Sequence, residues 1–214
     1  MSPVLTATVR VAATLPAPST VRADLAVPAA VSAGIDEHRR AVAAVLAGRD
    51  DRLLAVVGPC SVHDPAAGLH YAHLLAGAAA AHTADLLVVM RAYLEKPRSL
   101  LGWTGLVPDP DMDGSGDLAR GLRTGREFLG RVAATGLPVG YEFLDPMLAP
   151  YLADLVSWGA IGARTVASQP HRQLASGLPM PVGMKNAVSG DVRVAVEAVR
   201  AAAAPHRFAG MDPG

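Results

Sequence analysis

The feature of this sequence that most constrains its fold is an alternation between short apolar runs and segments with helical spacing of apolar residues. The apolar runs lie at residues 53–58, 86–93, 138–144, 160–165 and 182–185. The helical segments that follow them lie at residues 66–81, 118–134, 149–157, 172–176 and 192–204. Continuous apolar strands separated by helices are typical of a parallel sheet that helices cover. The sequence therefore predicts an α/β fold of five β/α units, either doubly wound or part of a barrel.

Polar residues at the ends of the predicted strands favour the barrel. They lie at or just after the carboxyl end of each strand: Cys60, Arg91, Glu142, Arg164 and Lys185. A barrel draws its active site from many successive strands, whereas a doubly wound sheet concentrates its site at one switch point. A closed (β/α)8 barrel needs eight strands over typically about 250 residues. We therefore expect about the first five units of an incomplete TIM-barrel fold, in a chain cut short at its C-terminus.

The composition argues against several classes of protein. The 214 residues are 51% hydrophobic and carry 19 basic and 19 acidic groups, which excludes disorder caused by high net charge. Zero net charge gives no global field for nucleic acid or an anionic membrane. No apolar run approaches the roughly 18 residues of a membrane helix. The single cysteine, Cys60, cannot form an internal disulfide, and no signal peptide is evident, so we expect a cytoplasmic location.

The chain divides into three parts. Residues 1–33 contain several prolines and no sustained period, so we expect a loosely structured N-terminal arm. Residues 34–52 predict a leading helix that packs against or caps the fold. Residues 53–214 predict the partial barrel, which is the catalytic domain.

Four cations at the strand ends predict an anion site. Only two of the 19 basic residues are lysines, Lys96 and Lys185. The segment 91–99 places three cations and a hydroxyl at a strand end and in the following loop, while Arg164 and Lys185 end later strands. Guanidinium and ammonium groups are suited to phosphate and carboxylate. A solvated basic loop is the alternative for the segment 91–99.

Glu142 and Cys60 are the other candidates for chemistry at the strand ends. Glu142 can orient water or relay a proton, or it can form a salt bridge to one of the cations. Cys60 can ligate a metal with His63 nearby, but these two supply at most two ligands, and a catalytic metal usually needs three from the protein. A structural cysteine is therefore the alternative.

These residues stand within a dense set of motifs, and on them the chain resembles the type I 3-deoxy-D-arabino-heptulosonate 7-phosphate (DAHP) synthases. The motifs are Gly-Pro-Cys-Ser-Val-His-Asp at 58–64, Met90-Arg91, Glu-Lys-Pro-Arg at 95–98, Gly-Trp-Thr-Gly-Leu at 102–106 and Glu-Phe-Leu-Asp at 142–145. The strongest block spans residues 157–178, and it is followed by Pro-Val-Gly at 181–183 and Lys185-Asn186. The resemblance runs from about residue 34 to the end of the chain.

The resemblance implies a (β/α)8 barrel that condenses phosphoenolpyruvate with erythrose 4-phosphate and releases phosphate, in the first step of the shikimate pathway. It implies that Arg91, Lys96, Arg164 and Lys185 grip phosphoenolpyruvate, with the backbone of Gly162 and Ala163 and the side chain of Glu142 nearby. Lys96, Lys185 and Glu142 are the catalytic candidates by this resemblance. It further implies that Arg98 and Ser99 meet the sugar phosphate and that Cys60 is one ligand of a divalent metal (Mn, Fe, Co or Zn). The complete protein is expected to be a homo-oligomer.

The sequence also departs from the family pattern. The resemblance implies further metal ligands, a histidine, a glutamate and an aspartate, and a further arginine, on later strands that this sequence lacks. Metal binding by this chain is therefore doubtful. Ser99 replaces a usual threonine, Ala167 replaces a usual glutamate, and residues 187–190 differ from the usual Gly-Thr-Asp-Gly.

Three hypotheses remain open at this point. The first is a fragment of a complete DAHP synthase. The second is a naturally truncated, catalytically impaired subunit that binds phosphoenolpyruvate or serves assembly. The third is a different phosphoenolpyruvate-using aldolase with five strands and its own metal arrangement.

Overall fold

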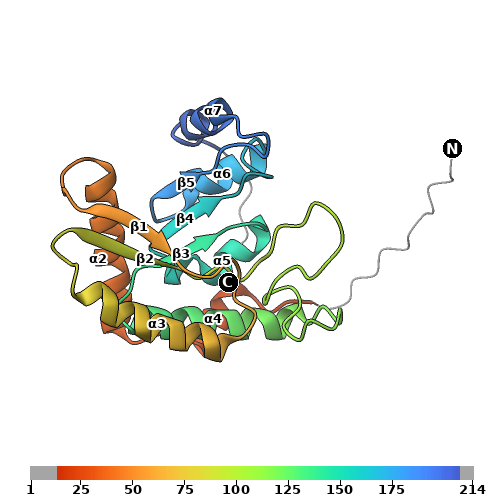
Figure 1. Ribbon diagram of the computed structural model, residues 1–214. Coiled ribbons are helices and arrows are strands. Elements are labelled where there is room, and N and C mark those ends of the chain that lie inside the picture. The colour runs from red at the N-terminus through yellow and green to blue at the C-terminus, as the bar shows by residue number, and fades with distance from the viewer. Residues whose placement is uncertain (1–13, 208–214) are drawn as a thin grey trace, which may run out of the picture.

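The computed structural model describes residues 14–207, and its centre is one parallel sheet of five strands (Figure 1). The strands are β1 (Leu53–Val57), β2 (Leu86–Arg91), β3 (Val139–Glu142), β4 (Trp158–Ile161) and β5 (Val182–Met184). They pair in the order β1-β2-β3-β4-β5, so each new strand adds to the same edge of the sheet. A doubly wound sheet would reverse direction at a switch point. The sequential order therefore confirms the expected incomplete (β/α)8 barrel.

Helices connect the strands and cover the outside of the sheet. They are α3 (Pro65–Ala80), α4 (Leu118–Ala134), the short pieces η1 (Pro146–Leu148), α5 (Ala149–Leu152) and η2 (Ala153–Leu155), then α6 (Gln169–Gly177) and α7 (Val192–Ala202). Figure 1 shows α3 and α4 side by side along one side of the sheet, with α6 and α7 beside β5 at the far end. No helix in the described part of the chain is long and apolar enough to cross a membrane.

Aspartate side chains determine where several of these helices begin. Asp64 accepts hydrogen bonds from the backbone N–H groups of Ala66 and Ala67 at 2.8 and 3.1 Å, and Pro65 occupies the first turn of α3. Asp117 and Asp191 cap α4 and α7 in the same way. These caps satisfy backbone donors that the first helical turn leaves unpaired.

The residues before the sheet correct the expectation of a loosely structured arm. Residues 1–13 lie outside the described residues, but Pro18–Asp24 form the helix α1 and Ala29–Leu46 form the helix α2. The leading helix thus begins at Ala29 rather than at residue 34, and it ends at Leu46. Pro18 lies in the first turn of α1 and Pro28 is the N-cap of α2, positions where proline starts a helix rather than breaking it. Whether residues 1–33 act as a separate part stays a prediction.

Two further boundaries differ from the prediction. The predicted helix at 149–157 is a series of short turns that ends at Leu155, because Val156 is already extended. The Ser157 N–H then bonds to the Val139 carbonyl at 2.8 Å, so β4 starts at Trp158 instead of residue 160. Because β4 ends at Ile161, Arg164 lies in the turn after the strand and not within it.

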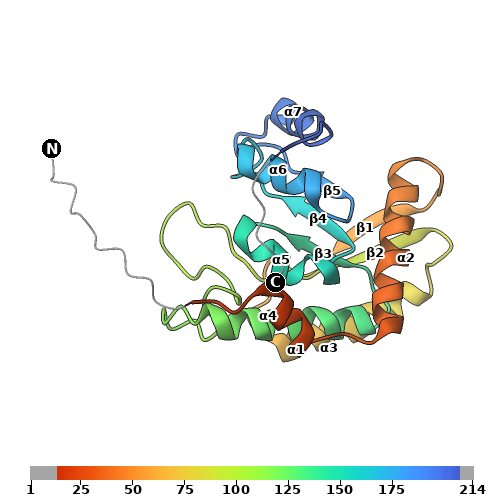
Figure 2. The same cartoon turned by 180° about the vertical axis from the view of Figure 1, so that it is seen from behind.

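The two faces of the sheet have different partners. On the inner face, Leu87 and Val89 of β2 pack with Val42 of α2, and Trp158 lies beside them. Figure 2 shows α2 beside β1. A larger core holds residues such as Met90 and Val139 against the outer helices. Because side chains alternate along a strand, Arg91 continues the inner series begun by Leu87 and Val89.

Candidate active site

The strand register brings three of the predicted site residues to one face. Arg91 pairs with Gly140, Glu142 pairs with Ala160, and Ala160 pairs with Gly183. Paired residues of neighbouring strands point to the same side, and side chains two residues apart along a strand do too. Arg91, Glu142 and Lys185 therefore project from the inner face at the carboxyl end of the sheet, as the sequence predicted.

Glu142 and Lys185 form an ion pair at this end of the sheet. The Lys185 ammonium donates to Oε2 of Glu142, whose side chain is only 4% exposed while that of Lys185 is 34% exposed. The other carboxylate oxygen faces Gly162, and a Cβ at that position would overlap it. Of the two roles that the sequence left open for Glu142, the structure shows the salt bridge, and Gly162 makes the room for it.

Tyr93 links this pair to Arg91, and the sequence analysis missed it. Its ring lies 4.1 Å from Cζ of Arg91 and 5.1 Å from Nζ of Lys185, both measured to the ring centroid. Burial raises the pKa of the Tyr93 phenol to about 12, so the ring is neutral at physiological pH. Its spacing of two residues from Arg91 is the signal that could have placed Tyr93 on the inner face.

Cys60 and Lys96 form a second contact beside Arg91. The Lys96 ammonium lies 2.6 Å from the Cys60 sulfur, and Arg91 Nη2 donates to the Cys60 carbonyl oxygen at 3.0 Å. Gly58 allows this approach, because it has φ +146° and a Cβ there would lie 2.7 Å from the Arg91 carbonyl oxygen. The Lys96 hydrogen bond lowers the pKa of the Cys60 thiol. The thiol is therefore easier to ionise than an ordinary cysteine.

Substituting Lys96→Met should raise the pKa of the Cys60 thiol, because the nearest cation is lost. We expect slower alkylation of Cys60 at neutral pH, measured with iodoacetamide as a function of pH and in the presence of a chelator. Cys60 is the only cysteine in the sequence, so the rate reports this site alone. Arg49→Gln, which removes an exposed cation from the turn before β1, should leave the rate unchanged, and an unchanged rate in Lys96→Met would contradict the contact.

The described residues do not by themselves make up a complete metal site. Within residues 14–207 there is no group of three or more histidine, cysteine, aspartate or glutamate side chains that could hold one. Cys60 supplies a thiol, but its sulfur contacts the Lys96 ammonium. A catalytic zinc site typically takes three ligands from the protein. Metal ligation by Cys60 therefore stays a prediction.

The remaining predicted residues lie in the loops after β2 and β4. Arg164 Nε donates to the Ser99 hydroxyl at 2.9 Å, so the structure brings these two together. Gly162 and Ala163 form the turn before Arg164, in which the Thr165 N–H bonds to the Gly162 carbonyl. Arg98 instead folds back on its own loop and donates to the Trp103 carbonyl at 2.7 Å.

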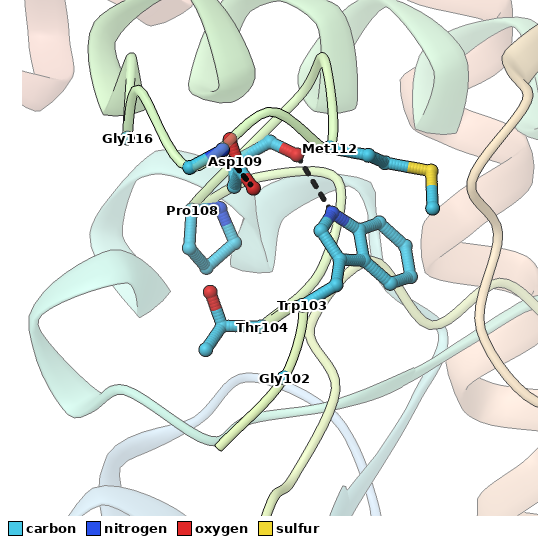
Figure 3. A pocket seen from close by; sticks show the side chains of 8 residues that line it. Gly102, Trp103, Thr104, Pro108, Asp109, Met112 and Gly116 are labelled. Atoms are coloured by element: carbon cyan, nitrogen blue, oxygen red, sulfur yellow. Dashed lines mark hydrogen bonds between the residues drawn. The ribbon is translucent and has the colours of Figure 1, made fainter.

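A small pocket lies farther along the loop that contains Arg98 (Figure 3). Trp103 Nε1 donates to the Asp109 carbonyl oxygen at 2.7 Å, and the Asp109 carboxylate accepts from the Gly114 N–H at 3.2 Å. Gly102 lines the pocket and also adjoins the Arg98 guanidinium. None of the predicted site residues lines this pocket, so we do not include it in the candidate site.

Glu95 is a second residue that the sequence analysis missed. Its buried carboxylate accepts hydrogen bonds from the Tyr141 hydroxyl at 3.0 Å and from the N–H groups of Leu144 and Asp145 at 3.3 and 3.0 Å. Burial raises the pKa of Glu95 to about 7 despite these donors. Glu95 therefore fastens the segment that carries Lys96 to the segment that follows Glu142.

Two curated relatives match most of this chain. The Phe-sensitive phospho-2-dehydro-3-deoxyheptonate aldolase of Escherichia coli is 52% identical over 170 residues, which cover 79% of this chain and 49% of the relative. The phospho-2-dehydro-3-deoxyheptonate aldolase of Corynebacterium glutamicum is 49% identical over 198 residues, which cover 92% and 54%. The chain spans about half the length of the curated relatives it matches.

Similarity extends to a solved structure. The phospho-2-dehydro-3-deoxyheptonate aldolase of Francisella tularensis superposes with a TM-score of 0.93 at 43% identity, covering 96% of this chain and 60% of that one. The model of the DAHP synthetase I family matches residues 27–214. That match covers most of the sequence, so the chain belongs to the DAHP synthetase I family.

Proposed function

We propose that this chain provides the phosphoenolpyruvate-binding part of a DAHP synthase. The whole protein would condense phosphoenolpyruvate with erythrose 4-phosphate to give DAHP and phosphate, the first step of the shikimate pathway. The observation that carries the proposal is the convergence of Arg91, Lys96 and Lys185 around Tyr93 and Cys60. Family membership supports it, since the relatives above are named for this aldolase activity.

Arg91 supports an anionic ligand in particular. Its Nε is buried and has no hydrogen-bond partner among the described residues. A buried donor without a partner is costly, and an oxygen of a bound carboxylate or phosphate would satisfy it. Lys96 and Lys185 add two ammonium groups that suit a phosphate as point charges.

The proposed chemistry uses the residues at the strand ends. The cations hold the carboxylate and phosphate of phosphoenolpyruvate while its C3 bonds to the aldehyde carbon of erythrose 4-phosphate. Water then adds at C2 and phosphate leaves. Glu142, which is paired with Lys185, would hold a proton of that water. Arg164 is proposed to grip phosphoenolpyruvate together with these cations, and its hydrogen bond to the Ser99 hydroxyl joins it to the next subsite. Ser99, and Arg98 after it releases the Trp103 carbonyl, are the proposed contacts to the sugar phosphate.

For the whole protein we propose a divalent metal with Cys60 as one ligand. The other ligands would have to lie outside residues 14–207, because no suitable group occurs within them. A homo-oligomer is proposed on the family resemblance alone, and a cytoplasmic location on the single cysteine.

Calorimetric titration of the purified chain with phosphoenolpyruvate tests the proposal. We expect saturable binding, and we expect Arg91→Gln to weaken it about tenfold, or about 1.4 kcal/mol, because a guanidinium that holds the anion is lost. Arg49→Gln removes the same charge at the opposite end of the sheet and should bind like the parent chain. Equal affinities for all three proteins, or no binding, would refute the proposed site.

A turnover assay separates the enzyme from a binding subunit. Phosphoenolpyruvate consumption is followed with erythrose 4-phosphate, with and without manganese. Binding without consumption supports a binding role for the chain by itself. Metal-dependent consumption would show that residues of this chain, or of a second copy, complete the metal site.

A further inference from the structure

Two cations of the proposed site share one aromatic ring. Tyr93 is 2% exposed, and its ring lies 4.1 Å from Cζ of Arg91 and 5.1 Å from Nζ of Lys185. Both distances fall within the roughly 6 Å at which a cation is attracted to the face of an aromatic ring. Tyr93 is thus the side chain that joins a residue at the end of β2 to one that follows β5.

Like charges repel, and within residues 14–207 only one of the two cations that face the ring has a counterion. Lys185 has the Glu142 carboxylate as counterion, whereas Arg91 takes part in no salt bridge among the described residues. Arg91 is held by the ring and by the Cys60 carbonyl oxygen. The negative face of the ring offsets part of the repulsion without adding a negative charge that would compete with an anionic ligand.

The backbone keeps the ring in place independently of the cations. The Val62 N–H donates to the Tyr93 carbonyl oxygen at 2.8 Å, and the Ala92 N–H donates to the Gly140 carbonyl at 2.8 Å. The backbone at Ala92 and Tyr93 is therefore anchored to β3 on one side and to the loop after β1 on the other. A ring fixed in this way can define where the two cations lie before any ligand arrives.

We propose that Tyr93 is a positioning residue, whose ring holds Arg91 and Lys185 at the spacing needed to bind a ligand with two anionic groups. The proposal rests on the proposed function, and it assigns the effect to the ring and not to the hydroxyl. A role as core filler alone would make any apolar side chain of similar size equivalent. The positioning role requires an aromatic ring at position 93, whereas the core-filling role requires only an apolar side chain of similar size.

Two substitutions separate the ring from its volume. Tyr93→Phe keeps the ring, so phosphoenolpyruvate affinity should stay within about twofold of the parent chain. Tyr93→Leu keeps an apolar side chain without a π face, and affinity should fall about tenfold, or about 1.4 kcal/mol. Phe128→Leu is the matched control, because it removes a buried aromatic of α4 that touches neither cation. It should lower stability toward urea and leave affinity unchanged.

A second measurement does not depend on phosphoenolpyruvate binding. The sequence contains only two lysines, so NMR of the chain labelled with isotopic lysine gives two side-chain signal sets, which Lys185→Arg assigns. The ring should shift the Lys185 signals in the parent chain and in Tyr93→Phe. Tyr93→Leu should lose that shift, while the Lys96 signals stay in place.

The two measurements keep the inference distinct from the proposed function. A parent chain that does not bind phosphoenolpyruvate but shows the ring shift would refute the function and support the positioning by Tyr93. Equal affinities for Tyr93→Phe and Tyr93→Leu, or Lys185 signals that Tyr93→Leu does not change, would overturn the positioning role.

Discussion

Replacing Lys185 with methionine should lower the free energy of unfolding by about 3 kcal/mol, because it leaves the buried Glu142 carboxylate without a counterion. The Glu142 side chain is 4% exposed, so water cannot replace the lost ammonium without opening the site. The same substitution removes one of the proposed phosphoenolpyruvate contacts. We therefore expect a less stable chain that also fails to bind the ligand, measured by urea unfolding at pH 8 and by calorimetry.

The reverse substitution separates desolvation from simple loss of the ion pair. Glu142→Gln leaves the Lys185 ammonium without a counterion, but that side chain is 34% exposed and can be hydrated. Its cost should be smaller, about 1 kcal/mol. The double variant Lys185→Met/Glu142→Gln should recover most of the stability lost in Lys185→Met but not the phosphoenolpyruvate binding. Equal costs for the two single variants, with additive effects in the double, would show that the pair is not buried as described.

The position of this pair was predictable because it depends on local pattern. Apolar runs locate the strands, and a polar residue near the end of a run lies at the carboxyl edge of a parallel sheet. Glu142 and Lys185 follow that rule directly. Arg164 also lies past its strand, but the turn at Gly162 separates it from the strand end.

What the sequence did not show depends on contacts between distant segments. Tyr93 matters because Lys185 arrives from β5, and Glu95 matters because Tyr141, Leu144 and Asp145 arrive from β3 and the residues after it. Spacing can place Tyr93 on the inner face of the sheet, but it does not show which distant residues Tyr93 or Glu95 contacts. The prolines before the sheet misled for a related reason, because a proline count cannot distinguish a helix start from an irregular segment.

Glu95 should make the stability of the chain decrease with pH between about 4.5 and 7. Burial raises its pKa from 4.5 to about 7, so the folded state disfavours the charged form. Below pH 4.5 the carboxyl is neutral in both the folded and unfolded states, and the full stability is present. As pH rises through 7 that contribution is lost, and the total loss is about 3 kcal/mol at 1.36 kcal/mol per pKa unit.

The groups around Glu95 explain why a costly carboxylate is retained there. The Tyr141 hydroxyl and the amides of Leu144 and Asp145 all donate to it, and donors of this kind favour the ionised form, although the nearby Asp145 carboxylate opposes ionisation. A neutral carboxyl accepts hydrogen bonds more weakly than a carboxylate, so protonation weakens these contacts. The ionised carboxylate thus orders the segment between Glu142 and α5 at the expense of stability above pH 7.

Glu95→Gln tests this account, because glutamine cannot titrate. Urea unfolding at pH 5, 6, 7 and 8 should show the variant less stable than the parent chain at pH 5, where the neutral carboxyl is tolerated and the amide disturbs the donors. The difference should shrink or reverse by pH 8, where the parent chain carries the cost of the buried charge.

Glu127→Gln, an exposed change on α4, is the control, and its stability should run parallel to that of the parent chain at every pH. Because other titrating groups cancel in the difference between variants, a Glu95→Gln curve that also runs parallel to the parent would mean that Glu95 is charged at pH 5 in the folded state. The buried Glu95 carboxylate would then order the segment after Glu142 without lowering the stability of the chain.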